Sequence, residues 1–243
     1  MDVYSGDHEA TCHKVCIMAY GLEFTNNSNV VTLDSEYARL SVLCSGRYAP
    51  TQESGLGSTT NFPFTITSTE PPLIFVRPDT TSNISGLCFA RVIGSPGAWT
   101  GFYVRAYDVN TAQPNGRYFA AAFMATRVAT WGMDLWDSAG KLLFDSGTPS
   151  ALFTRAYQNW TFVKTAPTGG AGFLNYYTVP FNFPANEYMM LNNFSMSMVA
   201  GNAPGRLLYC WWDFPSGTLW AITSGTSNPT AFYLPALFAK MNN

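Results

Sequence analysis

The sequence predicts an all-β protein, built as two tandem β-sandwich-like modules that are each opened by a β-hairpin, with a short N-terminal arm. Three observations lead to this prediction: a hairpin-like motif that occurs twice, short apolar segments separated by turn residues, and a scarcity of helix-periodic stretches. We expect the arm to span residues 1–17, the first module residues 18–130 and the second module residues 131–243.

The duplicated motif occupies residues 20–35, YGLEFTNNSNVVTLDS, and residues 131–146, WGMDLWDSAGKLLFDS. The copies align without a gap at a constant offset of 111 residues and share identical Gly, Asp and Ser positions. In each copy an alternating apolar segment, a polar loop and a second apolar run follow one another, as in a β-hairpin. Asn29 and Gly140 occupy the same place in the loop, and both residue types enter the left-handed backbone region at low cost.

Short β-like segments continue along the rest of the chain and are separated by clusters of Pro, Gly, Asn, Asp and Ser. They cover residues 37–49, 62–67, 72–76, 86–94, 99–107, 157–164, 173–183, 193–201, 206–214, 218–225 and 230–238. Regular short strands of this kind are typical of a sandwich or a barrel. The segment 117–129, RYFAAAFMATRVA, tolerates a helix, but it runs directly into the second hairpin, so we predict that it is mostly strand.

The division into two modules rests on a second, weaker internal similarity. Residues 89–104 resemble residues 196–211 at an offset of 107 to 108, close to that of the hairpins. Because residues 20–130 and 131–243 are also nearly equal in length, tandem duplication explains both similarities. The alternative is that hairpin 131–146 closes the first sandwich and a different module follows.

The composition of the chain indicates which partners it can bind and in which cellular compartment it folds. Charged residues make up 12% of the 243-residue chain and aromatic residues 16%, so we expect partner subunits to cover part of the surface. The alternative is a monomer with a neutral surface.

A net charge of −2 with scattered basic residues gives no reason to expect nucleic acid as a partner, and no apolar run is long enough for membrane insertion. The N-terminus does not resemble a secretory signal, and five cysteines fit folding in a reducing cytoplasm.

The arm contains four potential metal ligands, His8, Cys12, His13 and Cys16, within nine residues. Zinc accepts mixed Cys and His sets in a tetrahedron. However, no second pair of ligands comes from elsewhere in the chain, and Cys12 and His13 are adjacent. We therefore favour an arm that binds no metal, with zinc binding as the alternative.

The sequence offers little support for an enzyme. Both histidines lie in the arm, and no G-x-S-x-G motif or phosphate-binding loop occurs, so we expect no catalytic residues and no cofactor. Paired carboxylates could in principle hydrolyse glycosidic bonds. For the duplicated Asp-Ser pairs we prefer a structural role, because Asp and Ser can hydrogen-bond the backbone and set a turn. The carboxylates concerned are Glu23, Asp34, Asp134, Asp145 and Asp213.

Trp211, Trp212 and Asp213 form the remaining candidate site for a ligand or an interface. Aromatic rings beside a carboxylate can serve as a platform for sugar rings, but aromatic residues also fill sandwich cores and subunit interfaces. Because neighbouring residues of a strand face opposite ways, we expect one tryptophan in the core and the other against a neighbour or ligand.

The hairpin motif, Tyr-Gly-Leu followed by a polar turn and an apolar strand that ends in Asp-Ser, resembles the opening of minor tail and tail-tip proteins of tailed bacteriophages. The copy WGMDLWDSAGKLLFDSG resembles it most closely. The resemblance implies a non-enzymatic virion component at the distal tail or in a fibre, synthesised in the host cytoplasm. It also implies other tail proteins as partners, and it favours a homotrimer. A carbohydrate- or receptor-binding module that contacts the host surface is the alternative function.

Overall fold

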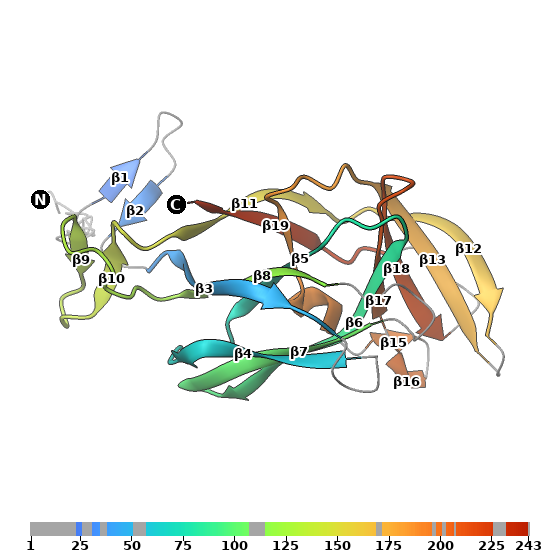
Figure 1. The fold of residues 1–243 in the computed structure, drawn as a ribbon, viewed down its shortest axis with the longest axis horizontal. Helices are drawn as coiled ribbons and strands as arrows, with labels where there is room; N and C mark the ends of the chain where they lie inside the picture. The colour runs from blue at the N-terminus through green and yellow to red at the C-terminus, as the bar shows by residue number, and fades with distance from the viewer. Residues whose placement is uncertain are drawn as a thin grey trace, which may run out of the picture.

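The computed structural model describes residues 23–25, 31–34, 38–50, 57–106, 115–168, 172–195, 198–200, 203–206, 208–225 and 232–242. These residues form antiparallel sheets and contain no α-helix; a single 3-10 turn, η1 (Asn192–Ser195), is the helical element among them. The predicted all-β class is therefore confirmed (Figure 1).

One sheet closes into a six-stranded barrel with the strand order β11-β19-β14-β5-β8-β3. Its members are β3 (Leu40–Tyr48), β5 (Leu73–Pro78), β8 (Gly116–Phe123), β11 (Ser150–Tyr157), β14 (Tyr188–Met190) and β19 (Ala236–Asn242). The barrel closes where Ser150 of β11 pairs with Ser41 of β3.

The second sheet has seven strands in the order β12-β13-β18-β17-β6-β7-β4. They are β4 (Gly57–Ile66), β6 (Ile84–Ser95), β7 (Ala98–Ala106), β12 (Thr161–Pro167), β13 (Phe173–Pro180), β17 (Leu208–Asp213) and β18 (Thr218–Gly225). A small separate hairpin consists of β15 (Met198–Ala200) and β16 (Ala203–Arg206).

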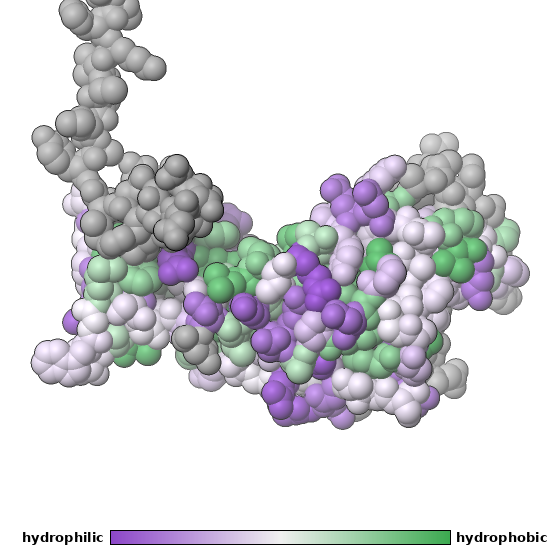
Figure 2. Space-filling model, turned by 90° about the horizontal axis from the view of Figure 1, so that it is seen from above, coloured by the Kyte–Doolittle hydropathy of each residue, from purple (hydrophilic) through white to green (hydrophobic). Residues whose placement is uncertain are grey.

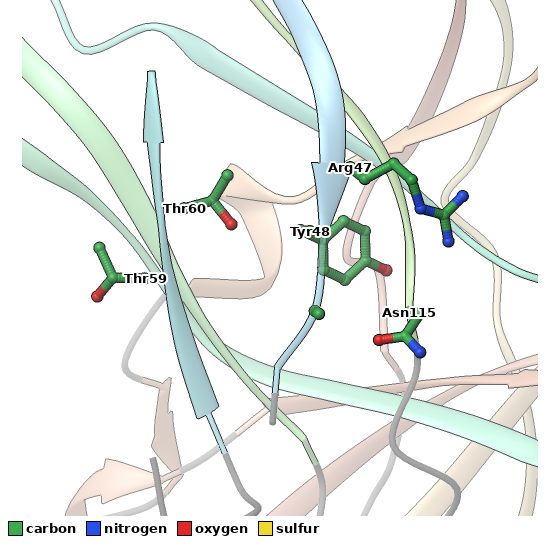
Figure 3. A pocket seen from close by; sticks show the side chains of 6 residues that line it. Arg47, Tyr48, Thr59, Thr60 and Asn115 are labelled. Atoms are coloured by element: carbon green, nitrogen blue, oxygen red, sulfur yellow. The ribbon is translucent and has the colours of Figure 1, made fainter. Parts of the chain in front are cut away.

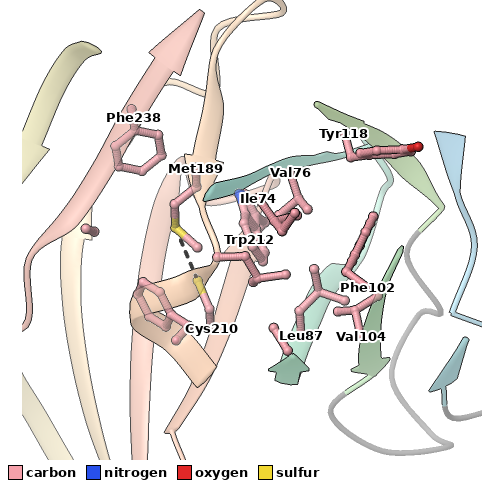
Figure 4. Packing of buried hydrophobic residues seen from close by; sticks show 14 of the residues in the cluster. Ile74, Val76, Leu87, Phe102, Val104, Tyr118, Met189, Cys210, Trp212 and Phe238 are labelled. Carbon is pink, nitrogen blue, oxygen red and sulfur yellow. Dashed lines mark hydrogen bonds between the residues drawn. The ribbon is translucent and has the colours of Figure 1, made fainter. Parts of the chain in front are cut away.

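The main core lies between the barrel and the seven-stranded sheet. Val76 and Phe238 from the barrel pack there with Phe102 and Trp212 from the sheet, and the Cys210 thiol lies 3.8 Å from the Met189 sulfur (Figure 4). A second cluster, which includes Phe75 and Phe119, covers the opposite face of the barrel strands. The two sheets therefore pack face to face, as expected for a β-sandwich-like protein.

Burial on both faces explains why the barrel strands have continuous apolar sequences rather than alternating ones. In β8, Tyr118 and Ala120 belong to the main core, whereas Phe119 and Ala121 belong to the second cluster. This arrangement requires apolar residues at successive positions, which in a sequence resemble a buried helix as much as a strand. The strand prediction for this part of residues 117–129 is confirmed from Gly116 to Phe123.

Strands from the two halves of the sequence pair with one another in both sheets. In the barrel, β11 pairs with β3 and β14 pairs with β5, and in the larger sheet β17 pairs with β6. The boundary predicted at residue 131 therefore does not separate one sheet from another, and the described parts of 18–130 and 131–243 share a core. Neither of the two main sheets is built from one half of the sequence alone, and the local pattern of a strand defines its faces but not its distant partner.

The two motif copies do form matching hairpins. β1 (Glu23–Thr25) pairs with β2 (Val31–Asp34), and β9 (Asp134–Trp136) pairs with β10 (Leu142–Asp145). Glu23 faces Asp34 in the first hairpin, and Asp134 faces Asp145 in the second. Every paired position of the second hairpin lies 111 residues after its counterpart in the first. In both hairpins the second strand has one extra, unpaired residue at the same place in the ladder. Figure 1 shows both hairpins toward the same end of the molecule, outside the two main sheets.

Candidate assembly and ligand-binding surfaces

The second hairpin is anchored by Asp145, whose side chain is almost fully buried. Its carboxylate accepts hydrogen bonds from the backbone amides of Val128 at 3.2 Å, Ala129 at 3.2 Å and Gly147 at 2.8 Å. Burial alone would raise the pKa of Asp145, but these amide hydrogen bonds outweigh burial and lower the pKa below its ordinary value. The carboxylate therefore ties the segment that enters the hairpin to the segment that leaves it.

Two further motif residues complete this anchor. The Ser146 hydroxyl accepts a hydrogen bond from the Met133 amide at 2.9 Å, and a side chain on Gly132 would place its Cβ 2.1 Å from that hydroxyl oxygen. Gly132, Asp145 and Ser146 are the three positions that are identical in both copies. The predicted backbone role of the Asp-Ser pair is confirmed in this copy. The first-copy residues Gly21 and Ser35 lie outside the described part of the chain.

The hairpin loop also follows the sequence prediction. Gly140 has φ +78°, in the left-handed region, as expected for the residue at this place in the loop. The Asp137 carboxylate accepts hydrogen bonds from the amides of Ala139 at 2.9 Å and Lys141 at 2.8 Å. The Asp137 carboxylate therefore holds the loop in place. The apolar side chains of the hairpin take no part in these hydrogen bonds.

Large apolar side chains project from this rigid backbone. Trp131 is 91% exposed, Val128 61%, Trp136 48% and Met133 37%; we call these four residues the hairpin surface. Figure 2 shows hydrophobic patches toward both ends of the molecule, with hydrophilic side chains gathered in the middle of the face seen there. Several exposed large apolar side chains within one short segment are typical of an interaction surface. The alternation in the motif predicts that Trp131 lies in a strand, whereas the structure places it before β9 with an exposed side chain.

Trp211 and Trp212 face opposite ways, as predicted. Trp212 is 2% exposed and lies in the main core, whereas Trp211 is half-buried on the other face of the seven-stranded sheet. The Asp213 carboxylate accepts a hydrogen bond from the Ser216 amide at 3.2 Å. It therefore helps to form the turn between β17 and β18.

Trp211 belongs to a set of aromatic side chains on the outer face of the seven-stranded sheet. Trp211 and Trp220 are direct cross-strand partners, and the Tyr176 ring meets them edge-on at centroid distances of 5.7 and 6.4 Å. The Lys164 ammonium lies 5.0 Å from the centre of the Tyr176 ring. We call Tyr176, Trp211 and Trp220 the outer aromatic group. Its members come from three strands, so the sequence alone could not assemble it.

The metal candidates His8, Cys12, His13 and Cys16 lie outside the described residues. Within the described part of the chain, no group of three or more His, Cys, Asp or Glu side chains is placed to hold a metal ion. The same residues include no helix with the length and hydropathy needed to cross a bilayer.

The candidate carboxylates have structural contacts where their side chains are described. Asp134 forms an ion pair with Arg127 at 3.2 Å, and Asp145 and Asp213 bind backbone amides as described above. The side chains of Glu23 and Asp34 lie outside the described part. A cavity of about 430 Å³ lies between β3 and β4 (Figure 3). It is lined by Arg47, Tyr48, Ala49, Thr59, Thr60 and Asn115. Its described lining contains no His, Asp or Glu to act as a general acid or base.

Comparison with protein-family models, with curated proteins and with solved structures finds no match to this chain.

Proposed function

We propose that the chain is a non-enzymatic structural subunit of a bacteriophage virion, located at the tail tip or in a tail fibre, where it contributes to assembly and host attachment. The observation that carries this proposal is the hairpin surface, on which large exposed apolar side chains are carried by a backbone fixed through hydrogen bonds to Asp145 and Ser146. The motif that builds this surface is also the one that resembles phage tail proteins.

Exposed aromatic side chains on the hairpin surface can supply the binding energy of a subunit interface. Subunit interfaces draw most of their affinity from a few aromatic anchors, and they gain when those anchors are held rigidly before binding. Trp131 and Trp136 meet both conditions, because Asp145 and Ser146 fix the segments around them. The low charge of the chain supports the same proposal, since few charged groups would have to be desolvated in a large interface.

Two measurements test the proposal. Native mass spectrometry of the full chain at micromolar concentration should give a homo-oligomer, with a trimer as the expected form. Antibody raised against the chain should decorate the tail of the phage particle in immunogold micrographs. A stable monomer that labels no part of a virion would overturn the proposal.

Carbohydrate or receptor binding is the second candidate function, and the outer aromatic group favours it. Half-exposed aromatic rings beside a Lys ammonium can stack on a sugar ring and bind its hydroxyls. An adsorption assay separates the two functions. If antibody decorates the tail without blocking adsorption to the host, the receptor-binding function is contradicted, while the structural one is supported.

A further inference from the structure

Three arginines lie side by side on neighbouring strands of the barrel. Arg117 of β8 is paired directly with Arg47 of β3 on one side and with Arg77 of β5 on the other. Residues directly opposite one another in an antiparallel sheet project from the same face. The three guanidinium groups therefore form a row, which we call the arginine row, in a chain with 13 Lys and Arg residues.

Such a row destabilises the fold unless a negative group offsets it, because like charges in directly opposite positions repel each other. One carboxylate, that of Asp79, forms an ion pair with Arg47. Arg77 donates to the backbone carbonyls of Pro184 at 2.8 Å and Phe183 at 3.1 Å, which carry no net charge. Burial, with a further contribution from the charge of Arg117, lowers the pKa of Arg77.

Arg117 is the member of the row with the least compensation. It is exposed, and no carboxylate of the described residues lies within ion-pair distance of it. Arg77 is held by its carbonyl contacts, and Asp79 balances the charge of Arg47. The row therefore leaves an unbalanced positive charge at Arg117.

A cavity of about 390 Å³ opens at this position. Arg47 and Arg117 line it together with Ser45, Tyr188 and Met241. Arg47 also lines the cavity between β3 and β4, and Figure 3 shows its side chain extending away from Thr59 and Thr60 of that cavity. The volume lies within the range of pockets that bind small ligands, whereas an acidic side chain of a partner protein would need no cavity.

We propose that the arginine row binds an acidic sugar unit, with its carboxylate, sulfate or phosphate group between Arg117 and Arg47 and its ring in the adjoining cavity. A planar guanidinium binds such oxyanions through two parallel hydrogen bonds. Both terminal nitrogens of Arg47 already donate to the Asp79 carboxylate, so Arg117 supplies the two-pronged contact and Arg47 contributes its positive charge beside it. Ser45 and Met241 line the same cavity, so a hydroxyl group and an apolar side chain are available there to contact a sugar ring. This site lies apart from both the hairpin surface and the outer aromatic group, so it does not depend on the proposed structural function.

Isothermal titration calorimetry of the full chain at low ionic strength tests the proposal with trigalacturonic acid as the probe. The chain should bind this acidic trisaccharide, and added salt should weaken binding because the contact is electrostatic. It should not bind maltotriose, the uncharged counterpart, to a comparable extent. Sodium sulfate serves as the free-anion probe; an affinity for sulfate equal to that for the trisaccharide would overturn the assignment of a sugar site.

The variant Arg117→Gln should weaken binding of the trisaccharide by about tenfold or more, the loss expected for a charge-assisted contact. Its melting temperature should stay the same or rise, since the substitution removes the repulsion within the row. Arg91→Gln is the matched control, because Arg91 is also an exposed arginine and lies on β6 of the other sheet. No binding by the native chain, or equal losses in both variants, would overturn the proposal.

Discussion

The Ser146 hydroxyl accepts a hydrogen bond from the amide of Met133 at 2.9 Å, and the Ser146 amide donates one to the carbonyl of Met133 at 2.9 Å. These two bonds close the base of the second hairpin. They require Gly132, because a Cβ at that position would overlap the Ser146 hydroxyl oxygen. The three residues retained in both copies of the motif are therefore explained by backbone geometry and the hydrogen bonds of Asp145.

Gly132→Ala should loosen the second hairpin without unfolding the main sheets. The added methyl group displaces Ser146, with an expected local loss of about 1–3 kcal/mol. Hydrogen exchange of the Met133 and Ser146 amides should then become about tenfold to a hundredfold faster. Ser138→Ala, in the exposed loop of the same hairpin, is the control and should leave both amides protected. Unchanged exchange in Gly132→Ala would contradict this account of the glycine.

The anchor at Asp145 should weaken in acid. Because the folded-state pKa of Asp145 is lowered, its stabilising contribution is complete above the ordinary value of 3.8 and is lost as pH falls through the lower folded value. Hydrogen exchange of the Val128, Ala129 and Gly147 amides, corrected for intrinsic pH dependence, should show this acid transition. Asp145→Asn should remove the transition and leave the three amides less protected at neutral pH. If the variant keeps it, another group is responsible.

The two adjacent tryptophans should differ strongly in their contribution to stability. Trp212→Ala leaves a cavity in the main core and should lower the free energy of unfolding by about 3–5 kcal/mol. Trp211→Ala removes a half-buried ring from the outer face and should cost about 1 kcal/mol, the value typical of an aromatic pair contact. Urea denaturation followed by circular dichroism measures both changes. Equal losses would show that the outer face is as tightly packed as the core.

Local patterns in the sequence predicted most of the strands, both hairpins and the opposite orientations of Trp211 and Trp212. They missed β11 and β14, and the 3-10 turn η1 lies at the start of the segment 193–201 that was predicted to be a strand. The correctly predicted features depend on neighbouring residues, whose side chains alternate across a strand or meet across a tight turn. The two hairpins have the same register because the two copies of the motif align at a constant offset. In β8, both faces are buried, so apolar and polar residues do not alternate. The sequence of this segment therefore distinguishes a strand from a helix less clearly.

Long-range strand pairing could not be predicted in the same way. Nothing in the local sequence of β17 identifies β6 as its neighbour, and nothing in β11 identifies β3. The arginine row shows the consequence for a candidate site. Arg47, Arg77 and Arg117 are separated by at least 30 residues in sequence, and the barrel register alone brings them together.

Removal of the two tryptophans from the hairpin surface should dissociate the oligomer. The double variant Trp131→Ser/Trp136→Ser removes the two aromatic anchors but leaves Asp145 and Ser146 in place, so the hairpin should keep its hydrogen bonds. We expect the oligomer to dissociate at micromolar concentration, since loss of a central aromatic anchor costs about 2 kcal/mol or more at an interface. Native mass spectrometry measures the change, and circular dichroism verifies the fold. Phe162→Ser removes a comparably exposed ring from β12 and is the control. If this control dissociates the oligomer while the hairpin variant does not, the assembly surface lies on the edge of the seven-stranded sheet instead, because β12 is its terminal strand.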